Sequence, residues 1–128
     1  DLRVLGLNGR KVQSLKTIAS NFHWGFWSEE NFIRLTDQEV SRTVQTVKGL
    51  GPWSAASVLI FGLGRADVFP IEDFGVRVAL CKHYFPDETA ISVGRHLLKT
   101  RVKSIECTWR PYRTVATWFL WCSLENSS

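Results

Sequence analysis

Long apolar runs are missing from this 128-residue sequence. No stretch approaches the ~20 consecutive apolar residues of a membrane-spanning helix, and the first residues lack the order of a secretory signal. Cysteine is also scarce: Cys81, Cys107 and Cys122 are widely spaced and form no CxxC pair. This excludes a disulfide framework and gives no sign of a zinc site. We therefore expect an intracellular protein with no membrane contact and with reduced thiols.

Alternating apolar and polar residues, internal repeats and low-complexity tracts are absent too. Instead, apolar residues recur at helical spacing, and Asn8 and the pair Thr36 and Glu39 have the character of helix caps. The sequence thus predicts an all-α fold, forming one domain over residues 1–128. The predicted helices cover residues 9–22, 28–35, 36–47, 53–64 (buried on most sides), 73–85, 88–105 and 111–124.

Charge alone decides little about the partner. A net charge of +4 is compatible with a polyanion but is common among soluble proteins. The six tryptophans and eight phenylalanines say more, because so much aromatic surface serves either a core or stacking on a planar ligand. We expect both uses, with Trp118 in the core.

The segment VKGLGPW, residues 47–53, lies between two helical patterns. Two glycines separated by one residue allow a tight turn whose amides approach a phosphate, and the dipole of the next helix adds to the attraction. An ordinary helix–helix turn would also contain glycine. The hairpin alone therefore does not distinguish a phosphate-binding turn from an ordinary one, and the residues that follow it in the chain are needed to decide.

A carboxylate lies beyond the hairpin in DVFPIEDFGV, where Asp73 is 22 positions after Gly51. An aspartate at a helix start can be a simple cap, and that role is compatible with catalysis. Glu72 is adjacent, but neighbouring side chains normally point in different directions. Asp67 is expected to stabilise the loop.

This order of hairpin, helix, proline-containing loop and aspartate resembles the helix-hairpin-helix DNA glycosylase superfamily. GLGPWSA, DVFP, ED and WRPYRTVATWFLW are similar to 3-methyladenine DNA glycosylase II and related alkylpurine glycosylases. The resemblance implies the glycosylase fold without the family's upstream helices, which an additional N-terminal segment or a companion chain would supply. It also implies excision of alkylated, cationic purines from double-stranded DNA during base excision repair, with Asp73 as the catalytic carboxylate.

The resemblance further implies a hydrolase without lyase activity. Bifunctional relatives carry lysine where this sequence has Trp53, and tryptophan cannot form the imine that strand cleavage requires. Trp53, Phe74 and Trp121 match positions that line the base pocket, where aromatic faces attract a cationic base. No catalytic cofactor is implied, and three scattered cysteines cannot hold an iron-sulfur cluster.

At the hairpin, the resemblance implies contacts to a DNA phosphate and a structural Na⁺ or K⁺. The phosphate would be bound by Gly49, Gly51, Trp53, Ser54 and Lys48. The cation would be bound by the main-chain oxygens of Gln45, Val47 and Leu50. Arg110 and Arg113 are expected to add salt-sensitive affinity.

Two alternatives remain open at this stage. One is a helix-hairpin-helix module that binds DNA or a protein without turnover; the other is a glycosylase for deaminated or oxidised bases. The retained Asp73 and tryptophans favour the enzyme, since neither is needed to grip phosphates. A repair enzyme would act in the nucleus of a eukaryote or the cytoplasm of a prokaryote.

Overall fold

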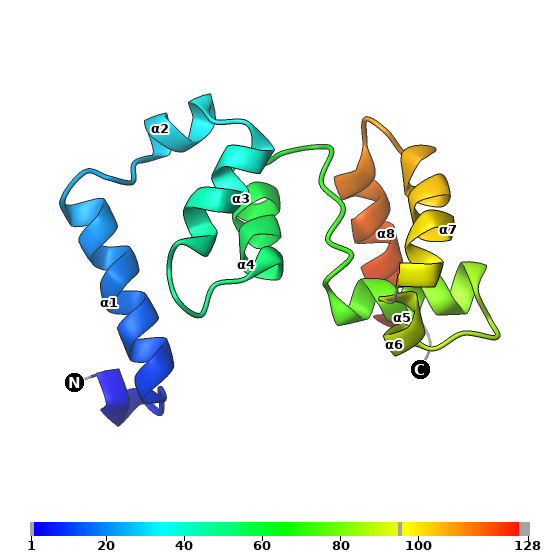
Figure 1. Ribbon diagram of the computed structural model, residues 1–128, viewed down its shortest axis with the longest axis horizontal. Helices are drawn as coiled ribbons and strands as arrows, with labels where there is room; N and C mark the ends of the chain where they lie inside the picture. The colour runs from blue at the N-terminus through cyan, green and yellow to red at the C-terminus, as the bar shows by residue number, and fades with distance from the viewer. Residues whose placement is uncertain (1, 95, 126–128) are drawn as a thin grey trace. The chain divides into compact units, whose positions relative to one another are not determined.

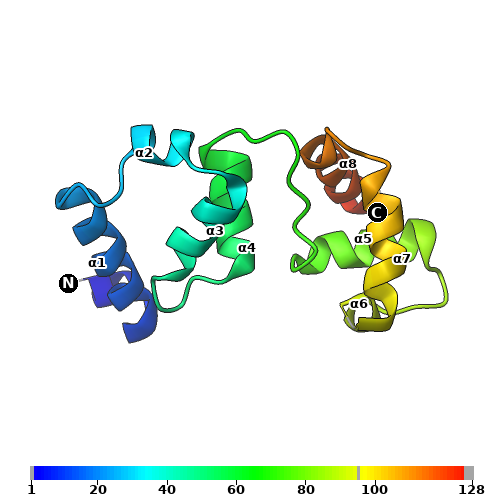
Figure 2. The same ribbon diagram turned by 45° about the horizontal axis from the view of Figure 1, so that its top comes forward.

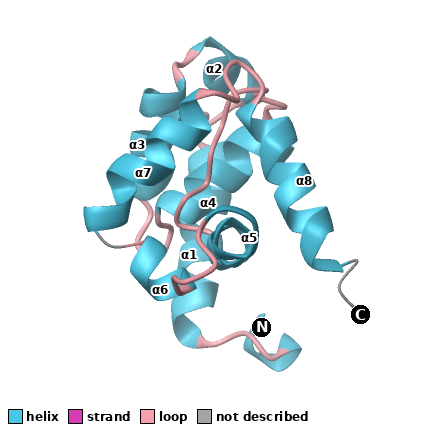
Figure 3. Ribbon diagram, turned by 90° about the vertical axis from the view of Figure 1, so that its right-hand side faces the viewer, coloured by secondary structure: helices cyan, strands magenta, loops and turns pink. Residues whose placement is uncertain are grey.

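The computed structural model describes residues 2–94 and 96–125 as helices joined by loops (Figures 1 and 3), with no strand in these ranges. This confirms the all-α prediction. The contacts divide the chain into two compact units, Asp1–Leu63 and Gly64–Ser128. The single domain over residues 1–128 stays a prediction.

The first unit has a short 3₁₀ turn, η1 (Leu2–Leu5), before its helices. These are α1 (Gly9–His23), α2 (Glu29–Arg34), α3 (Asp37–Gln45), α4 (Pro52–Ser57) and a π-helical turn, η2 (Val58–Gly62). Polar caps start the first three helices as their sequences predict: Asn8, Ser28 and Thr36 each accept a hydrogen bond from a first-turn amide. Thr36 and Glu39 form the expected capping box.

Valines from α3 and from the turn that follows it lie buried in the first unit. Val40, Val44 and Val47 are buried and are joined by Ala55 and Leu59. The apolar segment beyond the hairpin is less enclosed than predicted, because Trp53 and Phe61 are exposed. It also changes from α- to π-helical hydrogen bonding at Val58, so the prediction of one helix buried on most sides is wrong.

The second unit contains α5 (Phe74–Tyr84), α6 (Ala90–Val93), α7 (His96–Cys107) and α8 (Arg113–Glu125). Helix α5 packs against both α8 and α6, and α6 lies beside it in Figure 1 and in Figure 2. Apolar residues of α5, α6, α7 and α8, and Phe85 at the end of α5, form one core. Its members are Val76, Ala79, Leu80, Phe85, Val93, Leu98, Val102 and Leu120.

Two predicted boundaries in this unit are wrong. The single helix over residues 88–105 is two helices, since α6 ends at a C-cap on Gly94 and α7 begins at His96. Pro111 precedes the last helix rather than opening it, and follows a cis peptide bond from Arg110.

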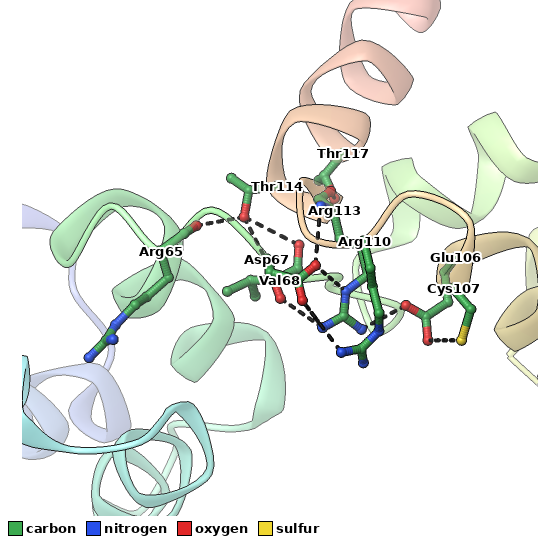
Figure 4. A network of polar contacts seen from close by, with 9 residues as sticks. All are labelled: Arg65, Asp67, Val68, Glu106, Cys107, Arg110, Arg113, Thr114 and Thr117. Atoms are coloured by element: carbon green, nitrogen blue, oxygen red, sulfur yellow. Dashed lines mark hydrogen bonds and ion pairs between the residues drawn. The ribbon is translucent and has the colours of Figure 1, made fainter.

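A polar network fixes the loop that leads toward Asp73 (Figure 4). Arg113 Nε donates to Asp67 Oδ1 at 2.6 Å, and its Nη1 donates to Glu106 Oε2 at 2.7 Å. Arg113 Nη2 reaches both Asp67 Oδ2 at 3.0 Å and the Asp67 carbonyl at 2.8 Å. We call these three residues the Arg113 clamp.

The neighbouring Thr114 extends the clamp, since its hydroxyl donates to the Arg65 carbonyl at 2.7 Å. The hydrogen bond from Arg113 lowers the pKa of Asp67, and the bond to Asp67 raises the pKa of Arg113. The expected loop role of Asp67 is confirmed. Arg113 joins α8 to this loop and to α7, so its expected use as a DNA-facing cation is wrong.

Candidate active site

Asp73 closes the loop that starts at Pro70 and caps α5. Its amide donates to the Pro70 carbonyl at 2.9 Å, which turns the chain into the helix. Its Oδ1 accepts from Val76 N–H at 2.8 Å and from the indole Nε1–H of Trp121 at 3.0 Å. The half-buried carboxylate is therefore a cap and is also oriented from a second helix.

Gly75 leaves space for this arrangement. A Cβ at residue 75 would lie 3.1 Å from Asp73 Oδ1 and 3.5 Å from Trp121 Cδ1. The first distance is tighter than ordinary van der Waals contact, so a side chain here would press on the carboxylate. Asp73, Gly75 and Trp121 thus form one packed unit.

Trp118 extends the aromatic surface beside Trp121. The two rings meet edge to face, with centroids 5.5 Å apart and planes at 83°. Trp118 is 49% exposed, so its predicted place in the core is wrong. The sequence does carry a signal for this contact: Trp118 lies three residues before Trp121, and residues three apart share a helix face.

Phe74 and Arg77 cover another side of the same loop. Phe74 is 61% exposed, and the Arg77 guanidinium carbon lies 5.9 Å from its ring centroid. Arg77 Nη2 donates to the Glu72 carbonyl at 3.2 Å, holding the backbone just before Asp73. The sequence did not single out Arg77, whose contacts depend on the fold of the loop.

Replacing Trp121 with phenylalanine should slow any reaction that depends on the Asp73 carboxylate about tenfold. The substitution keeps an aromatic ring but removes the donor to Asp73, and a hydrogen bond to a charged group contributes roughly 1.5 kcal/mol or more. Single-turnover kinetics measure the effect, with methylated DNA as the substrate that the sequence resemblance implies. Trp118→Phe is the matched control, because it keeps the Trp121–Asp73 bond, and an equal loss in both variants would contradict this role.

The predicted hairpin forms a tight turn in the first unit. Gly49 has a positive φ of 97°, and Leu50 N–H donates to the Val47 carbonyl at 3.0 Å. Gly51 is the N-cap of α4 and Pro52 follows at the first helical position. A glycine cap has no side chain to cover the first-turn amides, as a phosphate-binding helix start requires.

Two of the three predicted base-pocket residues lie in the same unit as Asp73. Phe74 and Trp121 lie with Asp73 in the second unit, whereas Trp53 lies on α4 in the first. Trp53 is exposed, which suits stacking, but its role stays a prediction.

The cation site at the hairpin also stays a prediction. Gln45 and Val47 precede the turn, and Leu50 lies within it. The Val47 carbonyl accepts from Leu50 N–H and keeps a second lone pair. Within residues 2–94 and 96–125 no group of three or more His, Cys, Asp or Glu could hold a metal.

Comparison with known proteins identifies the family, although no family model matches the chain. It is 34% identical over 121 residues to DNA-3-methyladenine glycosylase 1 of Schizosaccharomyces pombe, covering 94% of this chain and 50% of that relative. It is 31% identical over 139 residues to the DNA-3-methyladenine glycosylase of Saccharomyces cerevisiae, covering 91% and 47%.

A solved structure agrees with these relatives. The S. pombe 3-methyladenine DNA glycosylase in complex with abasic DNA superposes with a TM-score of 0.79 at 32% identity, covering 98% of this chain and 58% of that one. The chain belongs to the alkylpurine branch of the helix-hairpin-helix DNA glycosylase superfamily. The predicted glycosylase fold is confirmed.

The chain spans about half the length of the curated relatives it matches. Among its described helices, none combines the length and apolarity needed to cross a membrane. Its cysteines Cys81, Cys107 and Cys122 form no disulfide with one another. Burial raises the pKa of the Cys81 thiol, which keeps that group in its unreactive form.

Proposed function

We propose that this chain is the catalytic part of a monofunctional DNA glycosylase that excises alkylated purines from double-stranded DNA. The observation that carries the proposal is the Asp73 carboxylate, held at the start of α5 by Val76 N–H and the Trp121 indole. A carboxylate that only capped the helix would need no second donor from α8.

The chemistry requires a fixed negative charge beside the sugar. As the base leaves, positive charge develops on C1′, and an oriented carboxylate stabilises that oxocarbenium-like state. The same group orients and deprotonates the attacking water. A cationic base is already a good leaving group, so one carboxylate suffices without a separate general acid.

Recognition of the base would rely on aromatic faces. The enzyme must rotate the damaged nucleotide out of the duplex to reach its glycosidic bond. Phe74 and Trp121 lie next to the carboxylate, and we propose a base-stacking role for the exposed Trp53 as well. Aromatic faces attract an alkylated purine by cation-π interaction, on the order of 1–2 kcal/mol when desolvated, which normal neutral bases do not gain.

The hairpin would hold the DNA backbone. Amides of Gly49, Gly51, Trp53 and Ser54 would face a phosphate, with Lys48 adding charge. A Na⁺ or K⁺ on the carbonyls of Gln45, Val47 and Leu50 would stiffen the turn. Such contacts fix register without reading sequence, which suits an enzyme that recognises damage. We place its activity in the compartment that holds DNA: the nucleus of a eukaryote or the cytoplasm of a prokaryote.

Incubation with methylated duplex DNA should release free 3-methyladenine or 7-methylguanine and leave an intact strand with an abasic site. Chromatography detects the base, and a labelled strand should break only after alkali treatment. Borohydride should trap no protein–DNA adduct, because Trp53 occupies the place of the imine-forming lysine. Strand cleavage without alkali would contradict the hydrolytic mechanism.

A second candidate is a DNA-binding module without turnover, favoured by the coverage of only about half of each relative. Duplex binding with no release of any methylated base would support it. Release of hypoxanthine or an oxidised base alone would instead point to a glycosylase of different specificity.

A further inference from the structure

The amino-terminal part of the first unit carries charge of one sign. Residues 2–28 include Arg3, Arg10, Lys11 and Lys16 but no aspartate or glutamate. The net charge of the whole chain hides this local excess. Most of these cations lie on η1 and the first half of α1.

Helix α1 is tied directly to the hairpin. Ser14 Oγ donates to the Lys48 carbonyl at 2.8 Å, across 34 positions of sequence. At Gly49 a Cβ would lie 2.8 Å from Ser14 Oγ, and the φ of +97° disfavours a side chain there. The hairpin glycine therefore permits close approach of α1 as well as the turn itself.

This approach brings cations from two elements to one depression. Arg10, Gln13 and Lys48 line a cavity of about 200 Å³ together with Gly9 and Gly49. The three long side chains are exposed. In the part of the chain that the structure describes, neither Arg10 nor Lys48 forms an ion pair, so both can neutralise an external anion.

We propose that Arg10 and Gln13 on α1, together with Lys48, form a second anchor for the DNA backbone beside the hairpin turn. This inference rests on the proposed DNA-binding function, because the adjoining hairpin supplies the first phosphate contact. A guanidinium pairs with phosphate oxygens through two parallel hydrogen bonds, and a glutamine amide can add another. The anchor would act on any sequence, since these groups would meet phosphates and not base edges.

Fluorescence anisotropy with an undamaged duplex at several salt concentrations tests the anchor. Each neutralised phosphate contributes about 0.9 to the slope of log affinity against log salt. Arg10→Gln and Lys48→Gln should each flatten the slope by about 0.9 and weaken binding about three- to tenfold at 0.1 M salt. Arg10→Lys, which keeps the charge, should retain the slope.

Arg34→Gln is the matched control, since it removes one exposed cation from α2 in the same unit, outside the depression. If Arg10→Gln binds like Arg34→Gln, the anchor is wrong, whether or not the enzyme releases bases. If the slope changes but no base is released, the anchor stands and the proposed catalysis fails. A chain that binds no duplex would overturn the anchor.

Discussion

Asp73→Asn is expected to reduce release of methylated purines by at least about 10²- to 10³-fold, while binding to the duplex persists. Removing one preorganised group that stabilises transition-state charge typically costs about this much, and here the same change also removes the base that activates water. Single-turnover assays with saturating enzyme measure the chemical step directly.

The geometry makes this substitution a sharp test. Asparagine is a good N-cap, and its carbonyl oxygen can still accept from Val76 N–H and the Trp121 indole at the place of Asp73 Oδ1. Helix content and duplex affinity should therefore stay close to those of the unchanged protein. Glu72→Gln, which alters the exposed neighbour, should leave the rate nearly unchanged. Equal losses in both variants would contradict the role of Asp73 as the catalytic carboxylate.

Arg113→Ala should have the largest effect on stability, about 2–3 kcal/mol in the free energy of unfolding. The Arg113 side chain is only 15% exposed and that of Asp67 is 28% exposed. Removing the guanidinium leaves Glu106 without its ion-pair partner and leaves Asp67 with only the longer, 3.5 Å contact to Arg110. Breaking a buried pair costs about 3–5 kcal/mol, and partial exposure reduces that figure. Urea denaturation followed by circular dichroism measures the change.

Arg110→Ala provides the control for this variant. Arg110 also reaches Asp67, at 3.5 Å, but its side chain is 54% exposed, and exposed pairs contribute about 0–1 kcal/mol. A loss as large as that of Arg113→Ala would show that general charge near Asp67 matters more than the clamp.

The clamp should also make stability depend on pH. Because Arg113 lowers the pKa of Asp67 in the folded chain, the ionised carboxylate stabilises the fold above the unfolded pKa of about 3.9. That stability is lost as pH falls through the lower folded pKa. Asp67→Asn should be less stable at neutral pH, and the difference from the unchanged protein should shrink on acidification, as thermal unfolding at several pH values would show.

Local chemistry explains which parts of the fold the sequence predicts. Asn8, Thr36 and Asp73 were recognisable as caps because a cap acts within three residues. The change to π-helical bonding at Val58 and the break at Gly94 were not recognisable. Both lie in segments whose residues also suit an α-helix, so packing against other elements decides them.

The sequence likewise predicts some features of the candidate site and not others. Asp73 could be singled out by its spacing from the hairpin in the sequence, whereas its hydrogen bond with Trp121 joins residues 48 positions apart. Arg113 read as a surface cation, because nothing near it in sequence reveals that Asp67 faces it from 46 positions away. Sequence reasoning singled out the Asp73 carboxylate and missed the contacts that hold it.

Gly75 is a position where the Asp73 site restricts the residue type of the helix that carries it. A glycine inside a helix lowers stability by up to about 1 kcal/mol relative to alanine, yet the first turn of α5 keeps one where a methyl group would lie 3.1 Å from the carboxylate. That methyl group would press on the Oδ1 atom that caps α5 and accepts from the Trp121 indole, so the usual gain from alanine would be offset by a weaker cap. Residue 75 is thus a position where a routine Gly→Ala stabilisation would disturb the proposed catalytic carboxylate.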